Sequence, residues 1–393
     1  MQKYSLQFPI LLILILWFAG PAFAWIVSEK ATGRQNILVI MAKFPDVNPS
    51  LSIERLREKY FGKLNRYLKA VSHGKTWIEG KMTDWYTLPH EVGHYRLSSH
   101  NLAVDKQRVH RLIQDAINLA DQDEDFAQYS MLFVSLGAKR QHYGMMGLCG
   151  YPGMLGWQSQ IPVRTTAKGQ RIPGGVAIYC ENAHVGVVFH DMAHIMGGVK
   201  GSRRVLPCLY DHDLQAQKGS FRNQYQFYLV NVGFFDPMSC HFYKPNQGPP
   251  GVCAWTKLRL NWIASEKIVE IVHEKKKLLI GPLSKGESKV QAVRLPIDAT
   301  TYYLVENRQP LGPDRNLPSD GILIYYCDDE IAECRHGKSP IKLVDADPSV
   351  PELKGAPFTL TGRSTYRDEK RRVSVRLLAR KGEYYEIYVS NGR

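Results

Sequence analysis

The chain has 393 residues, of which 44% are hydrophobic, and this length exceeds the size at which one hydrophobic core stops growing. Lysine and arginine outnumber aspartate and glutamate by 51 to 37, but the basic residues are scattered, and the tight run at residues 275–277 lies between strand-like segments, which argues against nucleic-acid binding. The absence of a G-x-S-x-G elbow and of a G-x-x-x-x-G-K loop argues against common serine-hydrolase and nucleotide-binding folds.

The first 24 residues have the pattern of a signal peptide. Lys3 supplies a positive charge, residues 9–18 are mostly apolar, and residues 22–24 (AFA) form a small-x-small cleavage site. An uncleaved anchor is the alternative, but the apolar run falls short of the roughly 20 residues that a spanning helix needs. We therefore predict a secreted chain that begins near Trp25 and has no stable membrane span after cleavage.

Strand-like and helix-like segments alternate along the next part of the chain. Strands are predicted where apolar residues form short continuous runs or follow the β pattern, and helices where apolar residues recur every three or four positions. This alternation predicts an α/β domain over residues 25–264. Strands are expected at residues 36–42, 76–85 and 131–136, and helices at residues 52–71 and 102–119.

Helical periodicity disappears after about Trp262. Short strand-like runs follow one another there, separated by turn residues at spacings that are typical of a β-sandwich. We predict an all-β, sandwich-like domain over residues 265–393, and thus an α+β chain overall. The expected strands are residues 268–272, 277–280, 289–295, 302–306, 321–326, 373–378 and 384–389.

Two segments carry histidines four residues apart. HEVGH at residues 90–94 is a perfect H-E-x-x-H motif, whereas HDMAH at residues 190–194 has aspartate in the second position. The motif requires a helix, because histidines four residues apart then lie on one face and reach one zinc ion. The residue after the first histidine positions a water molecule as general base.

The first of these segments lacks a helical context. Pro89 precedes His90, the residues before it are strand-like and lead into a turn, and Gly93 weakens a helix inside the motif. We therefore expect HEVGH to be a chance match. The competing hypothesis, a site formed by His90, Glu91 and His94, predicts metal loss when His90 is replaced.

The second segment has the context of a short buried helix. Apolar residues lead into His190 and continue after His194, and two glycines at residues 197 and 198 end the helix. Two hydrogen-bonded histidines on a core helix are the structural alternative. We predict that His190 and His194 bind the metal.

Two later segments match what a zinc protease of the metzincin type needs. Residues 206–211 (LPCLYD) can supply a third ligand, and residues 235–239 (FDPMS) can form a methionine turn in which Met238 packs beneath the metal. Four further blocks, in order, are similar to the family stretches YYxEvSyGklxlxGkVtgWytlp, AWxKxxLGW, YFLIENRQ and LPGSGLLI. In this chain they read YLKAVSHGK with GKMTDWYTLP (67–75 and 80–89), AWTKLRLNW (254–262), YLVENRQ (303–309) and LPSDGILI (317–324).

Over nearly its whole mature length the chain thus resembles the immune inhibitor A peptidases, a family of secreted zinc metalloproteases. The resemblance implies a metzincin-like catalytic domain followed by a β domain, a zinc ion, and hydrolysis of peptide bonds in proteins. It puts Asp191 where the family has its catalytic glutamate. Because aspartate is one methylene shorter, its carboxylate falls about 1 to 1.5 Å short of the water, a displacement that can cost about 100-fold in rate.

The third zinc ligand stays open at this point. The family segment PDLYD becomes PCLYD here, with several residues added before it, so that Cys208 stands at the aspartate position. Cys208 as thiolate, Asp211 or His212 can each complete the zinc shell. Cys208 can equally pair with Cys240 in a disulfide and leave the third position to an oxygen ligand or to water.

The remaining cysteines and one acidic cluster give weaker predictions. The chain has seven cysteines, an odd number, and Cys327 and Cys334 flank a short acidic loop across which they can pair. Asp121, Asp123 and Asp125 have the spacing of the first ligands of a calcium loop. The glycine at its sixth place and the glutamate at its end are missing, so a polar helix end is favoured over a structural Ca²⁺ site.

Two functions are compatible with these patterns. The first is a secreted zinc-dependent metalloendopeptidase with Asp191 as general base and a protein or peptide as substrate. The second is a catalytically impaired pseudoprotease that acts as an exported binding or structural protein, and the aspartate at position 191 motivates it. The sequence leaves the substrate and the oligomeric state open.

Overall fold

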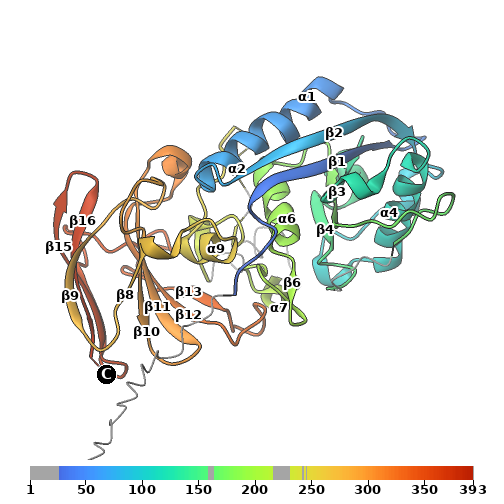
Figure 1. The fold of residues 1–393 in the computed structure, drawn as a ribbon. Helices are drawn as coiled ribbons and strands as arrows, with labels where there is room; N and C mark the ends of the chain where they lie inside the picture. The colour runs from blue at the N-terminus through green and yellow to red at the C-terminus, as the bar shows by residue number, and fades with distance from the viewer. Residues whose placement is uncertain (1–25, 158–162, 216–230, 241–242, 245, 393) are drawn as a thin grey trace, which may run out of the picture.

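A computed structural model describes residues 26–157, 163–215, 231–240, 243–244 and 246–392, and their helices and several β-sheets form an α+β fold (Figure 1). The predicted signal peptide lies outside these residues. The first part of the chain contains a five-stranded sheet of order β2-β1-β3-β5-β4, in which only the edge strand β4 is antiparallel to its neighbour. Its strands are β1 (Gly33–Lys43), β2 (Thr76–Thr87), β3 (Met131–Leu136), β4 (Gly147–Tyr151) and β5 (Gly175–Cys180).

Strand β1 explains why the sequence shows a continuous apolar run. Its side chains alternate between two cores: Ile37, Val39 and Met41 belong to the core beneath the α1–α2 segment and α6, and Leu38 and Ile40 to the core beneath α4. The sheet is therefore covered by helices on both faces. These helices are α1 (Ile53–Arg57) continued by the π-helical segment η1 (Glu58–Leu64) and α2 (Asn65–Val71), α4 (Lys106–Ala120), and α6 (Val185–Gly197).

Short elements complete this part of the chain. They are α3 (Val92–Tyr95), η2 (Asn101–Ala103), η3 (Phe126–Gln128), α5 (Arg140–Tyr143), β6 (Val199–Lys200), β7 (Arg203–Arg204), α7 (His212–Gln215), η5 (Gly233–Phe235) and α9 (Ala254–Arg259). The strands and helices that the sequence predicted for this part of the chain are present, with shifted ends.

The C-terminal part contains two antiparallel-rich sheets that share a core, of orders β13-β12-β11-β10-β8 and β14-β15-β16-β9. The seven strands expected from the sequence are present with shifted ends, and β13 and β14 were not anticipated. The elements are η6 (Ser265–Lys267), β8 (Ile268–Glu270), β9 (Lys275–Ile280), β10 (Ala292–Pro296), β11 (Thr301–Arg308), η7 (Gly312–Asn316), β12 (Gly321–Asp328), β13 (Ile341–Leu343), β14 (Thr365–Asp368), β15 (Val373–Lys381) and β16 (Tyr384–Asn391).

The two parts of the chain share a hydrophobic core. Leu304, Leu323 and Tyr325 of the C-terminal sheet belong to the same buried cluster as Phe189 and Met192 of α6. The other face of that sheet packs on the second C-terminal sheet. The C-terminal sheet and the helix that carries the candidate ligands thus belong to one continuous core, in which α9 contacts β11.

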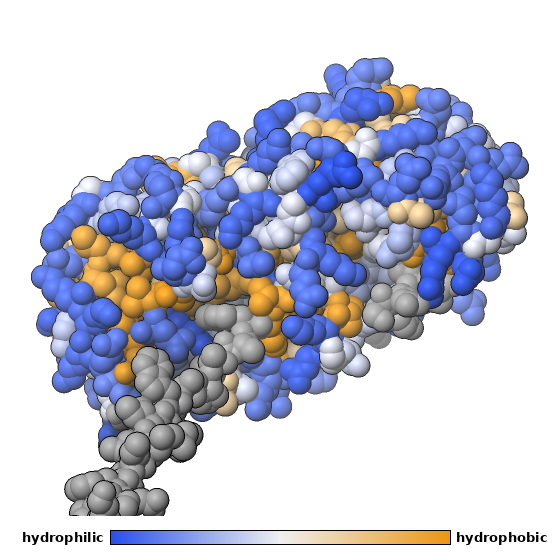
Figure 2. All heavy atoms as spheres, viewed as in Figure 1, coloured by the Kyte–Doolittle hydropathy of each residue, from blue (hydrophilic) through white to orange (hydrophobic). Residues whose placement is uncertain are grey.

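The face of the molecule drawn in Figure 2 is mostly polar. Figure 2 shows hydrophilic residues over most of the viewed face, with a hydrophobic area over the C-terminal sheets at the left. None of the helices that the structure describes combines the length and the apolar character required to cross a membrane.

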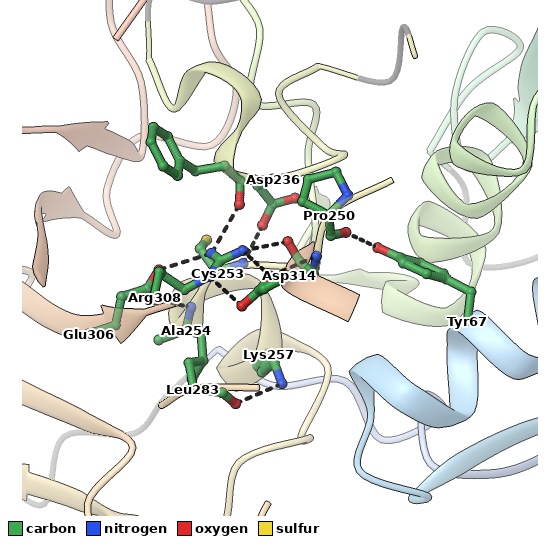
Figure 3. A network of polar contacts seen from close by, with 12 residues as sticks. Tyr67, Asp236, Pro250, Cys253, Ala254, Lys257, Leu283, Glu306, Arg308 and Asp314 are labelled. Atoms are coloured by element: carbon green, nitrogen blue, oxygen red, sulfur yellow. Dashed lines mark hydrogen bonds and ion pairs between the residues drawn. The ribbon is translucent and has the colours of Figure 1, made fainter. Parts of the chain in front are cut away.

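A buried polar network joins the C-terminal sheet to the loops that precede α9 in the sequence (Figure 3). Arg308 of β11 is fully buried and forms ion pairs with Asp314 at 2.7 Å and Glu306 at 3.1 Å. Its guanidinium also donates to the carbonyl oxygens of Phe235 and Gly251, at 3.0 and 2.8 Å. A further bond from Arg308 Nε to Asp314 at 2.9 Å brings the nitrogen–oxygen contacts of this buried cation to five, and together they fix the loop that begins at Phe235.

We predict that Arg308→Ala lowers the free energy of unfolding by about 3 to 5 kcal/mol, because it leaves two carboxylates buried without their cation. Urea denaturation of the full chain measures this loss. Arg66→Ala is the matched control, since Arg66 pairs with Glu58 on the surface, where ion pairs contribute about 0 to 1 kcal/mol. Equal losses for the two variants would contradict the assignment.

Candidate metal centre

Helix α6 carries both histidines into the interior of the molecule. The helix begins after His184, whose ring accepts a hydrogen bond from the Gly186 amide at 3.0 Å, and ends at Gly198, where φ is +67°. His190 and His194 are one turn apart on one face, and each is at most 3% exposed. The predicted helix and the burial of both rings are confirmed.

Hydrogen bonds to main-chain carbonyls orient the two rings. His190 Nδ1 lies 2.9 Å from the Pro237 carbonyl oxygen, and His194 Nδ1 lies 2.7 Å from that of Leu206. A carbonyl only accepts, so each Nδ1 carries the proton and each Nε2 presents a lone pair. Burial lowers the pKa of both histidines, which keeps them in the neutral form that binds metals.

The two Nε2 atoms face each other at 3.1 Å. Two neutral acceptors at this distance repel one another unless a cation or a donor lies between them. The sulfur of Cys208 completes the group, 3.5 Å from His190 Nε2 and 3.3 Å from His194 Nε2. Among the residues that the structure describes, these three form a buried cluster that could hold a metal ion.

The donor set fits a tetrahedral metal ion. Zinc bond lengths of about 2.0 Å to nitrogen and 2.3 Å to sulfur place two nitrogens about 3.3 Å apart, and nitrogen about 3.6 Å from sulfur, at tetrahedral angles. The distances in the cluster are within a few tenths of an ångström of these values. Burial raises the pKa of Cys208, but the nearby His212 and Arg204 outweigh it, so its pKa lies below the ordinary thiol value.

Cys208 is thus the one member of the three alternative ligands that joins the histidines. Asp211 is directed to the C-terminal part, where its carboxylate accepts a hydrogen bond from the Gly337 amide at 2.6 Å. The same carboxylate accepts a second hydrogen bond from the Asp213 amide at 3.0 Å. The ring of His212 lies beside that of Tyr210, at a distance of 4.9 Å between the ring centroids. Neither belongs to the three-residue cluster.

Asp191 follows the first histidine and is 6% exposed. One of its carboxylate oxygens, Oδ2, is buried and accepts no hydrogen bond from the described part of the chain. Burial raises the pKa of Asp191 to about 7, because a charge on this carboxylate is poorly solvated. An unsatisfied buried oxygen is costly in a stable protein, and here it borders the cavity described next.

The cluster opens into a cavity of about 620 Å³ between α6 and the edge strand β4. Gly147 allows the close approach of these elements, since a Cβ atom there would lie 2.9 Å from Val187 and 2.9 Å from Tyr179. Two of the large exposed hydrophobic side chains, Leu102 and Trp157, border the cavity. Arg204, Tyr210, Glu333 and Arg335 also line the cavity, and the Arg204 guanidinium lies over the ring of Trp157 at 5.5 Å from its centroid.

The predicted methionine turn lies directly behind His190. Asp236 stabilises it by accepting from the Met238 amide at 2.7 Å and from the Cys253 amide at 2.9 Å, and the second contact appears in Figure 3. Met238 is fully buried. The turn contacts the ring of His190 through the Pro237 carbonyl oxygen.

Three residues at the site were not singled out from the sequence: Arg204, Tyr210 and Glu333. The Tyr210 ring stacks on His190 at a centroid distance of 5.7 Å, and Arg204 pairs with Glu333 beside Cys208. The added residues before Cys208 were the one available signal for Arg204. Glu333 is far away in the sequence, and no local pattern connects it with the histidines.

The HEVGH segment has a different structure. Helix α3 starts only at Val92, so His90 lies outside it, and the His94 Nε2 atom lies 2.9 Å from a guanidinium nitrogen of Arg111. A neighbouring cation disfavours a metal ion at that nitrogen. His90 is exposed and joins no metal-binding group among the described residues. This agrees with the prediction that the segment is a chance match.

The acidic cluster at residues 121–125 is engaged in hydrogen bonds within the chain. Asp121 accepts from the Lys168 amide at 2.7 Å, Asp123 from the Tyr86 hydroxyl at 2.7 Å, and Asp125 caps η3. It forms no metal-binding group in the part of the chain that the structure describes. The favoured interpretation, a polar helix end, accounts for these contacts.

The disulfide expectations are not met. All seven cysteines are buried, and none is joined to another by a disulfide in the structure. Cys208 faces the two imidazoles rather than pairing with Cys240, and the Cys334 sulfur lies 3.1 Å from the Ser339 hydroxyl instead of bonding to Cys327. The odd cysteine count is therefore no guide to pairing in this chain.

Comparison with known proteins adds no family assignment: no protein-family model and no curated protein matches this chain.

We expect His190→Ala to abolish tight metal binding and His90→Ala to leave it unchanged, because only the former removes an Nε2 ligand from the cluster. Atomic absorption of the purified full-length variants after dialysis against zinc gives the stoichiometry. If His190→Ala keeps its bound zinc and His90→Ala loses it, the metal site lies in the exposed segment at residues 90–94 instead.

Proposed function

We propose that this chain is a secreted zinc-dependent metalloendopeptidase that hydrolyses peptide bonds in proteins. One observation carries the proposal: two neutral imidazoles and a thiol converge inside the molecule and border a cavity large enough for part of a peptide. Nitrogen and sulfur donors in tetrahedral arrangement favour zinc over magnesium or calcium, which prefer oxygen ligands. Export through the predicted signal peptide and a metzincin-like fold belong to this proposal.

The ligand number supports a catalytic rather than a structural zinc site. Structural sites use four protein ligands, whereas catalytic sites use three and keep one position open. His190, His194 and Cys208 are three. Zinc at such a site supplies Lewis acidity toward the carbonyl and the water that react.

Strand β4 supports a peptide as the substrate. It forms the edge of the sheet, and its residues Gly147, Leu148 and Cys149 border the cavity. An extended peptide can bind to such an edge through main-chain hydrogen bonds. The exposed side chains of Leu102 and Trp157 offer apolar contacts to the residues of that peptide.

Asp191 would act as the general base. Its Oδ2 atom has no hydrogen-bond partner among the residues that the structure describes and is therefore available to take a proton from a water molecule at the site. The shorter side chain relative to glutamate leaves a gap that lowers the rate. We expect turnover well below that of an otherwise equal site with glutamate.

The same feature favours the second candidate function. A carboxylate that does not reach the water would leave a protein that binds metal and peptide but hydrolyses slowly or not at all. In that case the cavity serves an exported binding protein.

We predict that the full chain, loaded with zinc, cleaves an unfolded protein substrate slowly, that chelation abolishes cleavage, and that Asp191→Glu raises kcat/KM by up to about 100-fold. Asp191→Asn is the matched control that keeps the size of the side chain and removes the base. Fluorescence of a quenched casein substrate measures the rates. If only Asp191→Glu cleaves, the binding-protein function replaces the peptidase.

A further inference from the structure

A loop of the C-terminal part holds the segment that supplies Cys208. The Arg203 guanidinium donates to the carbonyl oxygens of Asp329 and Glu330 at 3.1 and 3.2 Å. Further along, Asp213 pairs with Arg335 at 2.8 Å. The loop between β12 and β13 therefore contacts the chain on both sides of the metal-binding cysteine.

One contact of this loop is buried beside the metal cluster. Arg204 and Glu333 form a two-pronged ion pair, with Nη2–Oε2 at 2.7 Å and Nε–Oε1 at 3.0 Å. Their side chains are 6% and 10% exposed. Two-pronged arginine–carboxylate pairs fix the plane of the guanidinium, so Glu333 determines where the remaining nitrogen–hydrogen groups of Arg204 point.

The Arg204 guanidinium also lies next to the sulfur of Cys208. The Nη2–Sγ distance is 3.9 Å, within reach of a hydrogen bond to sulfur. Both residues border the cavity, as do Glu333 and His212. Besides the two imidazoles, the charged or titratable groups around the sulfur are Arg204 and His212 and, further away, Asp191 and Glu333.

We propose that Arg204, oriented by Glu333, is a positioning residue for Cys208: it holds the sulfur against the two imidazoles and balances the charge of the thiolate, so that the C-terminal part completes the metal centre. This inference rests on the metal centre of the proposed function. Groups that hydrogen-bond to metal ligands set ligand orientation and affinity, and their loss costs about 10- to 100-fold in metal affinity. An arginine is suited to this place because it stays charged when buried.

The neighbouring Arg203 provides a matched control. It binds the same loop through main-chain oxygens, is exposed, and has no contact with Cys208 among its hydrogen bonds in the structure. A role limited to attaching the loop predicts similar effects for the two arginines. A role in positioning the sulfur predicts an effect of Arg204 alone.

The test is a titration of the metal-free full chain with Co²⁺, whose thiolate charge-transfer absorption reports the cobalt–sulfur bond. The double variant Arg204→Gln/Glu333→Gln removes both buried charges together and leaves neither unpaired. We expect it to bind Co²⁺ about 10- to 100-fold more weakly and to show a shifted charge-transfer band at saturation. Arg203→Gln should keep the affinity within about threefold and the band unchanged.

A second series separates positioning from folding. Glu333→Gln alone should weaken Co²⁺ binding and add little to the effect of Arg204→Gln, because Glu333 acts through Arg204. Arg204→Lys keeps the charge and should restore part of the affinity. If every Arg204 variant binds Co²⁺ with the same affinity and shows the same charge-transfer band as Arg203→Gln, the inference is wrong. Absence of a charge-transfer band in the unsubstituted chain would instead overturn the metal centre itself.

Discussion

Two hydrogen bonds from imidazole to main-chain carbonyls determine what the centre of this molecule can do. His190 donates to Pro237 and His194 donates to Leu206, and each bond leaves one nitrogen lone pair directed at the space between the rings. A neutral imidazole has one donor and one acceptor, so fixing the donor also fixes the acceptor. The carbonyls that accept these bonds belong to loops rather than to α6. The helix supplies the spacing, and the loops supply the orientation.

The interior around the site is organised so that buried charges have partners. Arg308 binds Glu306 and Asp314 behind the turn that contacts His190, and Arg204 binds Glu333 on the other side. Ion pairs taken out of water stabilise little, but each holds its neighbours in one arrangement. Asp191 differs, because one of its oxygens is buried without a hydrogen bond and borders the cavity. Buried groups with unused hydrogen-bonding capacity concentrate at functional sites, and this one lies beside the candidate ligands.

The contrast between the two H-x-x-x-H segments shows how much the surroundings contribute. The perfect motif lies on the surface, with one histidine outside the helical turn and the other facing an arginine. The imperfect motif lies on a buried helix with carbonyl acceptors behind both rings. Metal ligands need a fixed geometry, and only the second segment has groups that fix it.

The sequence by itself determined the parts of the site that depend on local periodicity. Apolar residues around His190 and the glycines at residues 197 and 198 predicted a buried helix, and the four-residue spacing placed both imidazoles on one face. Only the tertiary structure showed that Cys208, rather than Asp211 or His212, lies with the two histidines. Neighbouring residues outside regular secondary structure point in directions set by distant contacts, here the Gly337 amide that binds Asp211 and the Arg204–Glu333 pair beside Cys208. The partners of that pair are 129 residues apart. No local pattern encodes such a contact, because it forms only when the loop between β12 and β13 meets the segment before Cys208.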